Sequence, residues 1–409
     1  MSTDDEAAVA EAGSGDPEGW RNPASVSIGV ASFLADAGHE VPTALLPGFL
    51  TATLGAPAAA LGLIEGIADG LAGGARLAGG ALADDPVRRR RSAIGGYTAT
   101  AVLSSAIGLA GSTVQVGMLR AGAWTARGLR VPARNALLAD VVSPKQYGRA
   151  YGFERAMDNL GAIAGPVLAL LLVTAVGVRG AMLISVVPGL MATGAMLYAI
   201  RRTTRPTQQR RSVRLRLKPL LATPLRRLAP GISLFEIGNV AATLLILRAT
   251  ELLEPGLGAD RAITTALGLY IAYNTAATLV SIPAGRISDR RGSTLTLAAG
   301  VGSFAVAYSI MAATGASVAM LAVGFLAAGV GIGIAETAEH TAVATYSPEQ
   351  VRGSAFGALA AVQAFGNVAA SSIAGILWTA FGAPLAFTYA AALMITSAIT
   401  LVVRRAPAA

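Results

Sequence analysis

Two related stretches of this chain carry its strongest structural signal: Gly80-Ala81-Leu82-Ala83-Asp84-Asp85-Pro86-Val87-Arg88-Arg89-Arg90 and Gly285-Arg286-Ile287-Ser288-Asp289-Arg290-Arg291-Gly292. Their aspartates lie about 205 residues apart. Two further pairs of segments share nearly the same offset, namely Leu61-Gly62-Leu63 with Leu267-Gly268-Leu269 and Ser143-Pro144-Lys145-Gln146 with Ser347-Pro348-Glu349-Gln350. The chain is therefore predicted to consist of two related halves, an arrangement typical of secondary transporters.

The segments around these stretches are strongly apolar. Of the 409 residues, 54% are hydrophobic and 13% are charged, and the mean hydropathy is +0.59. A membrane-crossing helix needs about 20 mostly apolar residues, whereas barrel strands need only about ten alternating ones. The apolar runs have helical length, and we expect twelve spans near residues 25–50, 57–82, 92–112, 115–141, 149–176, 179–200, 229–253, 263–287, 293–314, 317–345, 352–378 and 382–403.

The positive charges outside these spans fall mainly on one side of the membrane. By the positive-inside rule that side is cytoplasmic, and both termini lie on it. We expect a cytoplasmic membrane of bacterial type. The predicted domains are an acidic, disordered tail (1–22), a first six-helix bundle (23–200), a basic linker (201–228) with ten Lys or Arg, and a second bundle (229–405). The linker charges satisfy the topology, and binding of anionic lipid is the alternative explanation.

The paired stretches resemble the loop signature of the major facilitator superfamily, G-x-x-x-D-(R/K)-x-G-x-(R/K)-(R/K). The resemblance implies an all-α membrane protein with twelve transmembrane helices in two pseudo-symmetric six-helix bundles. It also implies that the signature aspartate caps a neighbouring helix and locks the outward-facing state. The gating residues implied by the two copies are Gly80, Asp84, Arg89, Arg90, Gly285, Asp289, Arg290 and Gly292.

The fifth span is similar to the antiporter signature of the same superfamily. Its matching positions are Gly152, Gly161, Gly165 and Pro166, and Asp158 lies among them. The final glycine pair of that signature is replaced by Ala169 and Leu170. This resemblance implies export.

Ionisable residues inside membrane spans are costly, so each is a candidate functional residue. Two clusters have the spacing of one helix face, Asp36/His39/Glu40 on the first span and Glu336/Glu339/His340 on the tenth, and Glu236 lies on the seventh. In the resembled family these spans line the central cavity. Three interpretations stay open: proton coupling, a divalent-metal site with His39 and His340 as candidate ligands, and structural pairing with arginines.

Arginines of the fourth span also share one helix face. Arg120 and Arg127 are the candidate contacts for an anionic group, and Glu154 and Asp158 are expected to form structural ion pairs with neighbouring arginines. The remaining residues proposed to contact substrate are Trp124, Asn239, Tyr270, Tyr273 and Asn274. For the aromatic rings, packing is the competing role.

The sequence therefore predicts a monomeric secondary transporter that works by alternating access. We expect it to exchange protons for an exported small molecule that is drug-like, amphipathic or an organic ion. Export of a divalent metal is the alternative, and an intramembrane enzyme is the rival from another class. The chain has no cysteine and no phosphate-binding G-x-x-x-x-G-K-(S/T) loop, so we expect no enzyme activity, no cofactor and no ATP-driven pumping. Nucleic acid is not expected as a partner.

Overall fold

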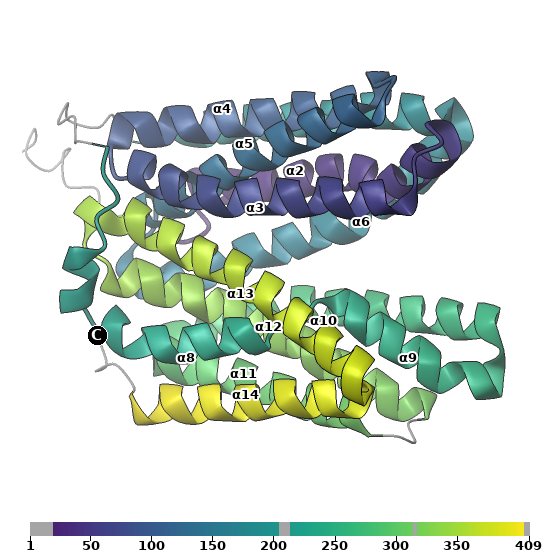
Figure 1. The fold of residues 1–409 in the computed structure, drawn as a ribbon. Helices are drawn as coiled ribbons and strands as arrows, with labels where there is room; N and C mark the ends of the chain where they lie inside the picture. Colours follow the sequence, from purple (N-terminus) through teal and green to yellow (C-terminus); the bar gives the residue numbers. More distant parts are fainter. Residues whose placement is uncertain (1–18, 204–212, 314–316, 405–409) are drawn as a thin grey trace, which may run out of the picture.

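A computed structural model describes residues 19–203, 213–313 and 317–404 of the chain. These residues form helices joined by short connections, in two groups that lie side by side (Figure 1). The first group comprises α2 (Pro23–Gly48), α3 (Ala58–Ala83), α4 (Pro86–Ala106), α5 (Thr113–Asp140), α6 (Tyr147–Ile184) and α7 (Val186–Arg201). The second comprises α8 (Leu225–Gly238), α9 (Ala242–Leu257), α10 (Ala259–Arg291), α11 (Ser293–Ala312), α12 (Val318–Tyr346), α13 (Arg352–Phe381) and α14 (Ala383–Val403).

Both groups follow the predicted order of six spans. The helix α6 contains a break at Gly177, where φ is 71°, a value that glycine adopts without steric cost. Beyond this break the chain continues towards α7. This break separates the fifth span from the sixth at the predicted place. In the described chain, seven helical segments are long and apolar enough to cross a membrane, or up to eight if a bent helix pair counts as one span. The helices α2, α3 and α5 are not among them, and each carries ionisable residues at its middle.

Two predicted spans differ from the structure in ways that have a clear physical cause. The third span was expected to begin at residue 92, but α4 begins at Pro86 because the Asp85 side chain accepts hydrogen bonds from the next turn and caps the helix. The seventh span was expected to be continuous over 229–253. It breaks into α8 and α9 around Asn239, with a bend of 41°.

The two halves meet closely at one end of the molecule. We call this the linker end, because the end of α7, the beginning of α8 and the end of α14 lie there (Figure 1). A Cβ at Gly80 would lie 2.8 Å from both the carbonyl oxygen of Gly353 and the Cα of Gly357. Gly148 and Gly285 approach one another in the same way. The small residues of both signature stretches therefore permit tight contact between helices of opposite halves.

At the opposite end, called here the far end, the described glycines of α3 and α10 make no such contacts. A Cβ added at Gly62, Gly66 or Gly70 of α3, or at Gly268 of α10, would meet nothing within 4 Å. At the linker end α3 touches α13, and α6 touches α10. The far-end glycines of α3 and α10 named above take part in no comparable contact. The molecule is closed at the linker end.

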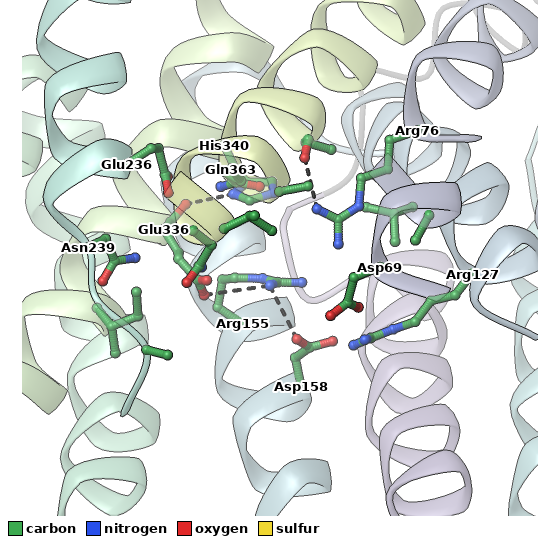
Figure 2. Close-up of a pocket in the computed structure, with 18 of the residues that line it drawn as sticks. Asp69, Arg76, Arg127, Arg155, Asp158, Glu236, Asn239, Glu336, His340 and Gln363 are labelled. Atoms are coloured by element: carbon green, nitrogen blue, oxygen red, sulfur yellow. Dashed lines mark hydrogen bonds and ion pairs between the residues drawn. The ribbon is translucent and has the colours of Figure 1, made fainter. Parts of the chain in front are cut away.

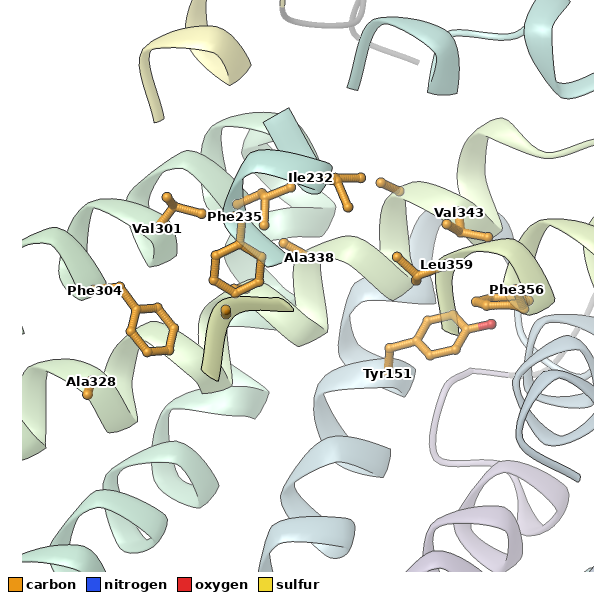
Figure 3. Close-up of a cluster of buried hydrophobic side chains, with 14 of the residues drawn as sticks. Tyr151, Ile232, Phe235, Val301, Phe304, Ala328, Ala338, Val343, Phe356 and Leu359 are labelled. Atoms are coloured by element: carbon orange, nitrogen blue, oxygen red, sulfur yellow. The ribbon is translucent and has the colours of Figure 1, made fainter. Parts of the chain in front are cut away.

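Aromatic side chains fill the core beside the interface (Figure 3). Tyr151 of α6 packs against Phe356 of α13 with ring centroids 5.7 Å apart, which joins the two halves. Within the second half, Phe235 of α8 packs against Phe304 of α11 at 5.6 Å. These contacts hold α8 and α13 in the positions from which they contribute polar residues to the site.

Candidate functional site

A cavity of about 520 Å³ lies between the two halves, and both halves line it. Its walls carry five arginines and five acids, and all five arginines and three of the acids come from the first half. The second half contributes Glu236 and Glu336 with uncharged polar residues (Figure 2). The charged lining residues are Asp36, Asp69, Arg76, Arg127, Arg130, Arg134, Arg155, Asp158, Glu236 and Glu336. The first wall is thus net positive and the second net negative.

Asp36 lies at the wall of this cavity on α2 and is 4% exposed. Its Oδ1 is 3.3 Å from Nδ1 of His39 and 3.8 Å from guanidinium nitrogens of both Arg127 and Arg130. A buried carboxylate needs such partners to remain ionised. Neither arginine makes a hydrogen bond shorter than 3.5 Å to Asp36, so these ion pairs can exchange partners more readily than a bidentate pair.

Arg155 connects the halves through the cavity. It donates from Nε to Glu154 at 2.7 Å, pairs with Asp158 at 3.2 Å and reaches Glu336 of the second half at 3.6 Å (Figure 2). Arg134 pairs with Glu154 at 2.8 Å and with Asp158 at 3.2 Å. The expected pairing of Glu154 and Asp158 with neighbouring arginines is therefore present.

The second half presents its acids around the break between α8 and α9. Glu236 lies in the last turn of α8, 2% exposed, and Asn239 follows where the helix ends. Glu339 of α12 is fully buried behind the cavity wall and accepts a hydrogen bond from Gln363 of α13 at 2.9 Å. His340 lines the cavity, with Nδ1 2.7 Å from the carbonyl oxygen of Glu336.

Several predicted contact residues lie outside the wall of this cavity. Arg120 is 1% exposed, because its guanidinium pairs with Glu65 at 2.9 Å and stacks over Trp124 at 3.4 Å. Trp124 itself donates to Asp69 at 2.9 Å. The remaining residues absent from the wall are His39, Glu40, Glu339, Tyr270, Tyr273 and Asn274. Of the two predicted anion contacts, the structure thus brings only Arg127 to the cavity.

The tyrosines of α10 face other partners. Tyr270 and Tyr273 stack on one another with centroids 5.7 Å apart, and Asn274 donates to the carbonyl of Tyr270 at 3.0 Å. The backbone of Tyr273 packs against Gly329 of α12. These contacts are the ones expected for the packing role of the two rings.

Several residues of the cavity wall were not among the predicted substrate contacts. Asp69 and Arg76 of α3 line it, and Arg76 donates to the carbonyl of Ala360 across the interface at 2.8 Å. The missed residues of α13 are Gln363, Asn367 and Ser371. They recur every four residues in an otherwise apolar span, so they share one helix face, and this periodicity was a usable signal.

The two signature aspartates occupy equivalent positions at the linker end. Asp84 of the first half accepts hydrogen bonds from the backbone N–H of Ser354 at 2.9 Å and from its hydroxyl at 2.5 Å. Asp289 of the second half accepts from the backbone N–H groups of Gly148 at 2.6 Å and Arg149 at 3.2 Å. Each carboxylate thus caps the first turn of a helix in the opposite half, α13 or α6. Burial raises the pKa of Asp84, and the hydrogen bonds from Ser354 oppose this rise.

Two arginines of the first signature stretch also make contacts at the linker end. Arg89 donates to the carbonyl of Ala83 at 2.6 Å and pairs with Asp140, which also lies 3.7 Å from Arg352 of the second half. Arg90 donates to Thr203 at 2.7 Å. Arg290 is exposed, and Gly292 ends α10 with a φ of 89°.

The glycines of the fifth span pack α6 against its neighbours. Gly161 and Gly165 face α2, at Asp36 and Glu40, and Gly152 faces Ser281 of α10. Pro166 lies inside the helix. These contacts bring α6, which carries Asp158, against the part of α2 that carries Asp36.

The two histidines do not form a metal cluster in this arrangement. No group of three or more His, Cys, Asp or Glu side chains that could hold an ion occurs within residues 19–203, 213–313 and 317–404. His39 is enclosed in the first half, whereas His340 packs against Tyr151 and Phe356 with centroids 5.8 and 6.0 Å away.

Comparison with known proteins identifies one family over most of the chain. The Major Facilitator Superfamily model matches residues 28–252 and 232–409. An uncharacterised MFS-type transporter of Methanocaldococcus jannaschii is 28% identical over 381 residues, covering 91% of this chain and 93% of the relative. An uncharacterised protein of Mycobacterium tuberculosis is 28% identical over 338 residues, covering 82% of this chain and 81% of that protein.

Solved structures share the fold at low sequence identity. A bacterial homologue of the iron transporter ferroportin in an outward-facing state has a TM-score of 0.75 at 14% identity, with 93% of this chain and 99% of that one covered. A human organic anion transporter has a TM-score of 0.71 at 16% identity, with 93% of this chain and 99% of that one covered. A fucose:proton symporter of E. coli has a TM-score of 0.70 at 17% identity, with 95% of this chain and 100% of that one covered. At such identities the likeness concerns the fold alone.

Proposed function

The chain belongs to the major facilitator superfamily and is a secondary transporter rather than an enzyme, and we propose that it exports a small organic molecule in exchange for protons. The observation that carries the proposal is the cavity between the halves, where Asp36 and Glu336 each face arginines across loose ion pairs. Such an acid can hold either a proton or a guanidinium partner. Binding of a proton therefore changes which charges are available to a substrate.

The end contacts support alternating access. The linker end is sealed by Asp84, Asp289 and the facing glycines, while the far ends of α3 and α10 make no such contacts. We assign the linker end to the cytoplasm from the positive-inside rule, which places both termini there. The described state is then outward-facing, and export requires the two caps to release.

The lining favours a polar substrate with charge. A net positive wall from the first half faces a net negative wall from the second. A molecule lying between them is able to pair with Arg127 on one side and with Glu336 on the other. Protonation of Glu336 or Asp36 removes a negative charge with which a cationic group of the substrate can pair, so it promotes release. Loss of the proton restores the carboxylate and allows binding, so proton and substrate compete for the cavity, as exchange requires.

The proposed assembly follows the same interpretation. We assign residues 23–200 and 229–405 to the two halves of a monomer in a cytoplasmic membrane of bacterial type. Of the basic linker 201–228, residues 204–212 lie outside the described residues, as do residues 1–18 of the acidic tail and residues 405–409. Arg216 of the linker donates its backbone N–H to the Ser354 hydroxyl at 3.1 Å, which ties the connection to the gate.

Transport is tested with purified protein in liposomes that contain a pH-sensitive dye, under an imposed proton gradient. Organic anions, cations and zwitterions are added in turn. We expect proton movement only when a transported compound is present, and we expect Asp36→Asn and Glu336→Gln each to reduce it at least tenfold. Asp260→Asn is the control, because Asp260 is an exposed acid at the start of α10 and outside the cavity wall.

Compound uptake without proton movement would refute proton exchange. Full activity of both acid variants would remove these acids from the mechanism. The alternative of divalent-metal export is examined in the same liposomes with Mn²⁺, Fe²⁺ and Zn²⁺. Proton movement with metals alone would favour that alternative over the proposal.

A further inference from the structure

Three side chains of α2 form a line that leads away from the cavity. Asp36 lines the cavity, and His39 lies one turn further along α2 with Glu40 beside it. Nδ1 of His39 is 3.3 Å from Asp36 Oδ1, and Nε2 is 3.3 Å from Glu40 Oε1. The imidazole thus connects the two carboxylates through its two nitrogens. Because α2 runs from the linker end to the far end, Glu40 lies on the far-end side of Asp36.

The backbone fixes which nitrogen of His39 carries hydrogen. Nδ1 is 2.8 Å from the carbonyl oxygen of Ala35, which only accepts hydrogen bonds, so Nδ1 must be the donor. In the neutral ring Nε2 then carries a lone pair. Among the described residues Nε2 has no hydrogen-bond partner, and it faces the Glu40 carboxyl. A lone pair and a carboxylate oxygen at this distance repel one another unless a proton lies between them.

We infer that His39 and Glu40 together hold one proton, which His39 relays to Asp36, so that Asp36 is loaded by a route separate from the substrate cavity. The inference rests on the proposed proton exchange and adds a path to it. In the transfer, the O–H bond of Glu40 breaks as the Nε2–H bond of His39 forms. The Nδ1–H bond then breaks as an O–H bond forms on Asp36. The ring is left with hydrogen on Nε2. The tautomer that the Ala35 carbonyl favours is restored when Nε2 releases this proton to the Glu40 carboxylate and Nδ1 takes up a proton from water.

The exposure of the three residues defines the direction of the route. The side chain of Glu40 is 27% exposed, whereas those of His39 and Asp36 are 1% and 6% exposed. Glu40 is therefore the most accessible of the three, and the inferred route begins there. The imidazole gives Asp36 a second approach besides the cavity that it lines.

The charges around His39 keep the proton shared with Glu40. From α5, the guanidinium groups of Arg127 and Arg130 act on the imidazole, and Arg120 acts on Glu40. From α6, Asp158 acts on Asp36, and from α4 the phenol of Tyr97 lines the same small pocket as His39. Two nearby positive groups disfavour an isolated imidazolium, so the carboxylate of Glu40 is needed to stabilise the proton.

A second pocket borders the imidazole on its other side. Its volume is about 10 Å³, which is close to the space of one water molecule. The hydroxyls of Tyr97 and Ser104 line it, and neither has a hydrogen-bond partner in the described part of the chain. This polar pocket suits an imidazole that changes its protonation.

Trp124 provides a direct test, because its ring lies 5.6 Å from the His39 ring, edge to face. Imidazolium quenches nearby indole fluorescence. The full chain with Trp20→Phe and Trp378→Phe, which leaves Trp124 as the single tryptophan, is placed in lipid nanodiscs and titrated from pH 8 to pH 4. We expect acid quenching that His39→Gln abolishes and His340→Gln, the change at the other histidine, retains. Glu40→Gln should move the midpoint about one pH unit lower, because the stabilising carboxylate is lost.

The route is tested by the rate of quenching after laser release of a caged proton. We expect Glu40→Gln to slow quenching at least tenfold and Asp36→Asn to leave its rate within twofold. Slowing by Asp36→Asn instead would show that protons reach His39 from the cavity and would overturn the inference. So would a titration that Glu40→Gln does not move. If His39→Gln fails to fold, the variants of Glu40 and Asp36 still decide the question.

This test needs no substrate, so it is separable from the transport assay. Proton-coupled transport without any His39 titration would overturn the relay and leave the proposed exchange intact. A His39 titration that depends on Glu40, with no proton movement for any compound, would support the proton-holding pair and refute the exchange.

Discussion

Glu154 shows how a single charge is accommodated inside the first half. It has no exposed surface, and its two oxygens accept from Ser32 at 2.7 Å, from Arg155 at 2.7 and 2.9 Å and pair with Arg134 at 2.8 Å. Both arginines also contact Asp158 at the cavity wall. A charge that no solvent reaches thus positions the groups that do face the cavity.

Replacing Glu154 should therefore destabilise the protein. In Glu154→Gln, Arg134 and Arg155 lose a buried anion, and we expect the free energy of unfolding to fall by about 3 kcal/mol. Thermal or denaturant unfolding in nanodiscs measures the change. Glu349→Gln serves as the control, because Glu349 is an exposed acid. Unchanged stability of Glu154→Gln would show that the arginines find other partners.

At the scale of helices, glycine decides which elements approach one another. In α6, Gly161 and Gly165 admit α2 and Gly152 admits α10, so one helix holds its own half together and contacts the other. In α3, Gly80 meets Gly353 and Gly357 of α13. Because glycine lets the backbones of these helices touch, a side chain added at these positions must force the helices apart.

A side chain at Gly80 should open the linker end. A Cβ there would lie 2.8 Å from backbone atoms of α13, so Gly80→Val is expected to favour the state that is open at this end. The chain has no cysteine, and Ala364→Cys therefore places a single thiol at the cavity wall. An impermeant maleimide should label it from the far end in the parent protein, and from the linker end in Gly80→Val.

Gly95→Val is the matched control, because a Cβ at Gly95 of α4 would meet nothing within 4 Å. It should keep the labelling pattern of the parent. Labelling of Gly80→Val from the far end alone would mean that the glycine contact does not control closure.

The positions of the spans were largely predictable from sequence, because apolar length and charge breaks report on burial in lipid directly. The break after α8 was not, since no proline lies at Asn239 and the bend depends on packing against α13, where Gly366 meets Glu236. Nor were the partners of Arg120 predictable. The helix face that carries Arg120 could be read from the residue spacing. Only the fold shows that its guanidinium is already engaged by Glu65 and Trp124.

At the scale of the whole molecule, two equivalent locks hold the linker end. Asp84 caps α13 from the first half, and Asp289 caps α6 from the second. The sequence repeat predicted this pair, since the resemblance implied a cap in each half. The cavity was less predictable, because its polar residues come from α2, α3, α5, α6, α8, α12 and α13 and meet only in three dimensions.

Loss of either lock should shift the conformational equilibrium. A capping carboxylate is worth about 1 kcal/mol, so Asp84→Ala and Asp289→Ala should each lower the ratio of closed to open linker ends roughly fivefold, and the double variant should lower it further. Distances between spin labels at the exposed positions 88 and 291, one in each half, report the populations. Asn22→Ala, which removes the cap of α2 within the first half, should leave them unchanged.

A shift in the Asn22→Ala control equal to that in the aspartate variants would assign the effect to general loosening. Unchanged distances in both aspartate variants would mean that the glycine contacts alone keep the linker end closed.

The distribution of charge along the cavity walls has a consequence for how the two halves pair. All five arginines of the cavity belong to the first half, and the second presents only acids among its charged residues there. Two copies of the first half set face to face would bring guanidinium groups against guanidinium groups, at a cost of several kcal/mol. Although the two halves share a sequence repeat, their cavity walls differ in charge, so each wall complements the opposite half and not a second copy of itself.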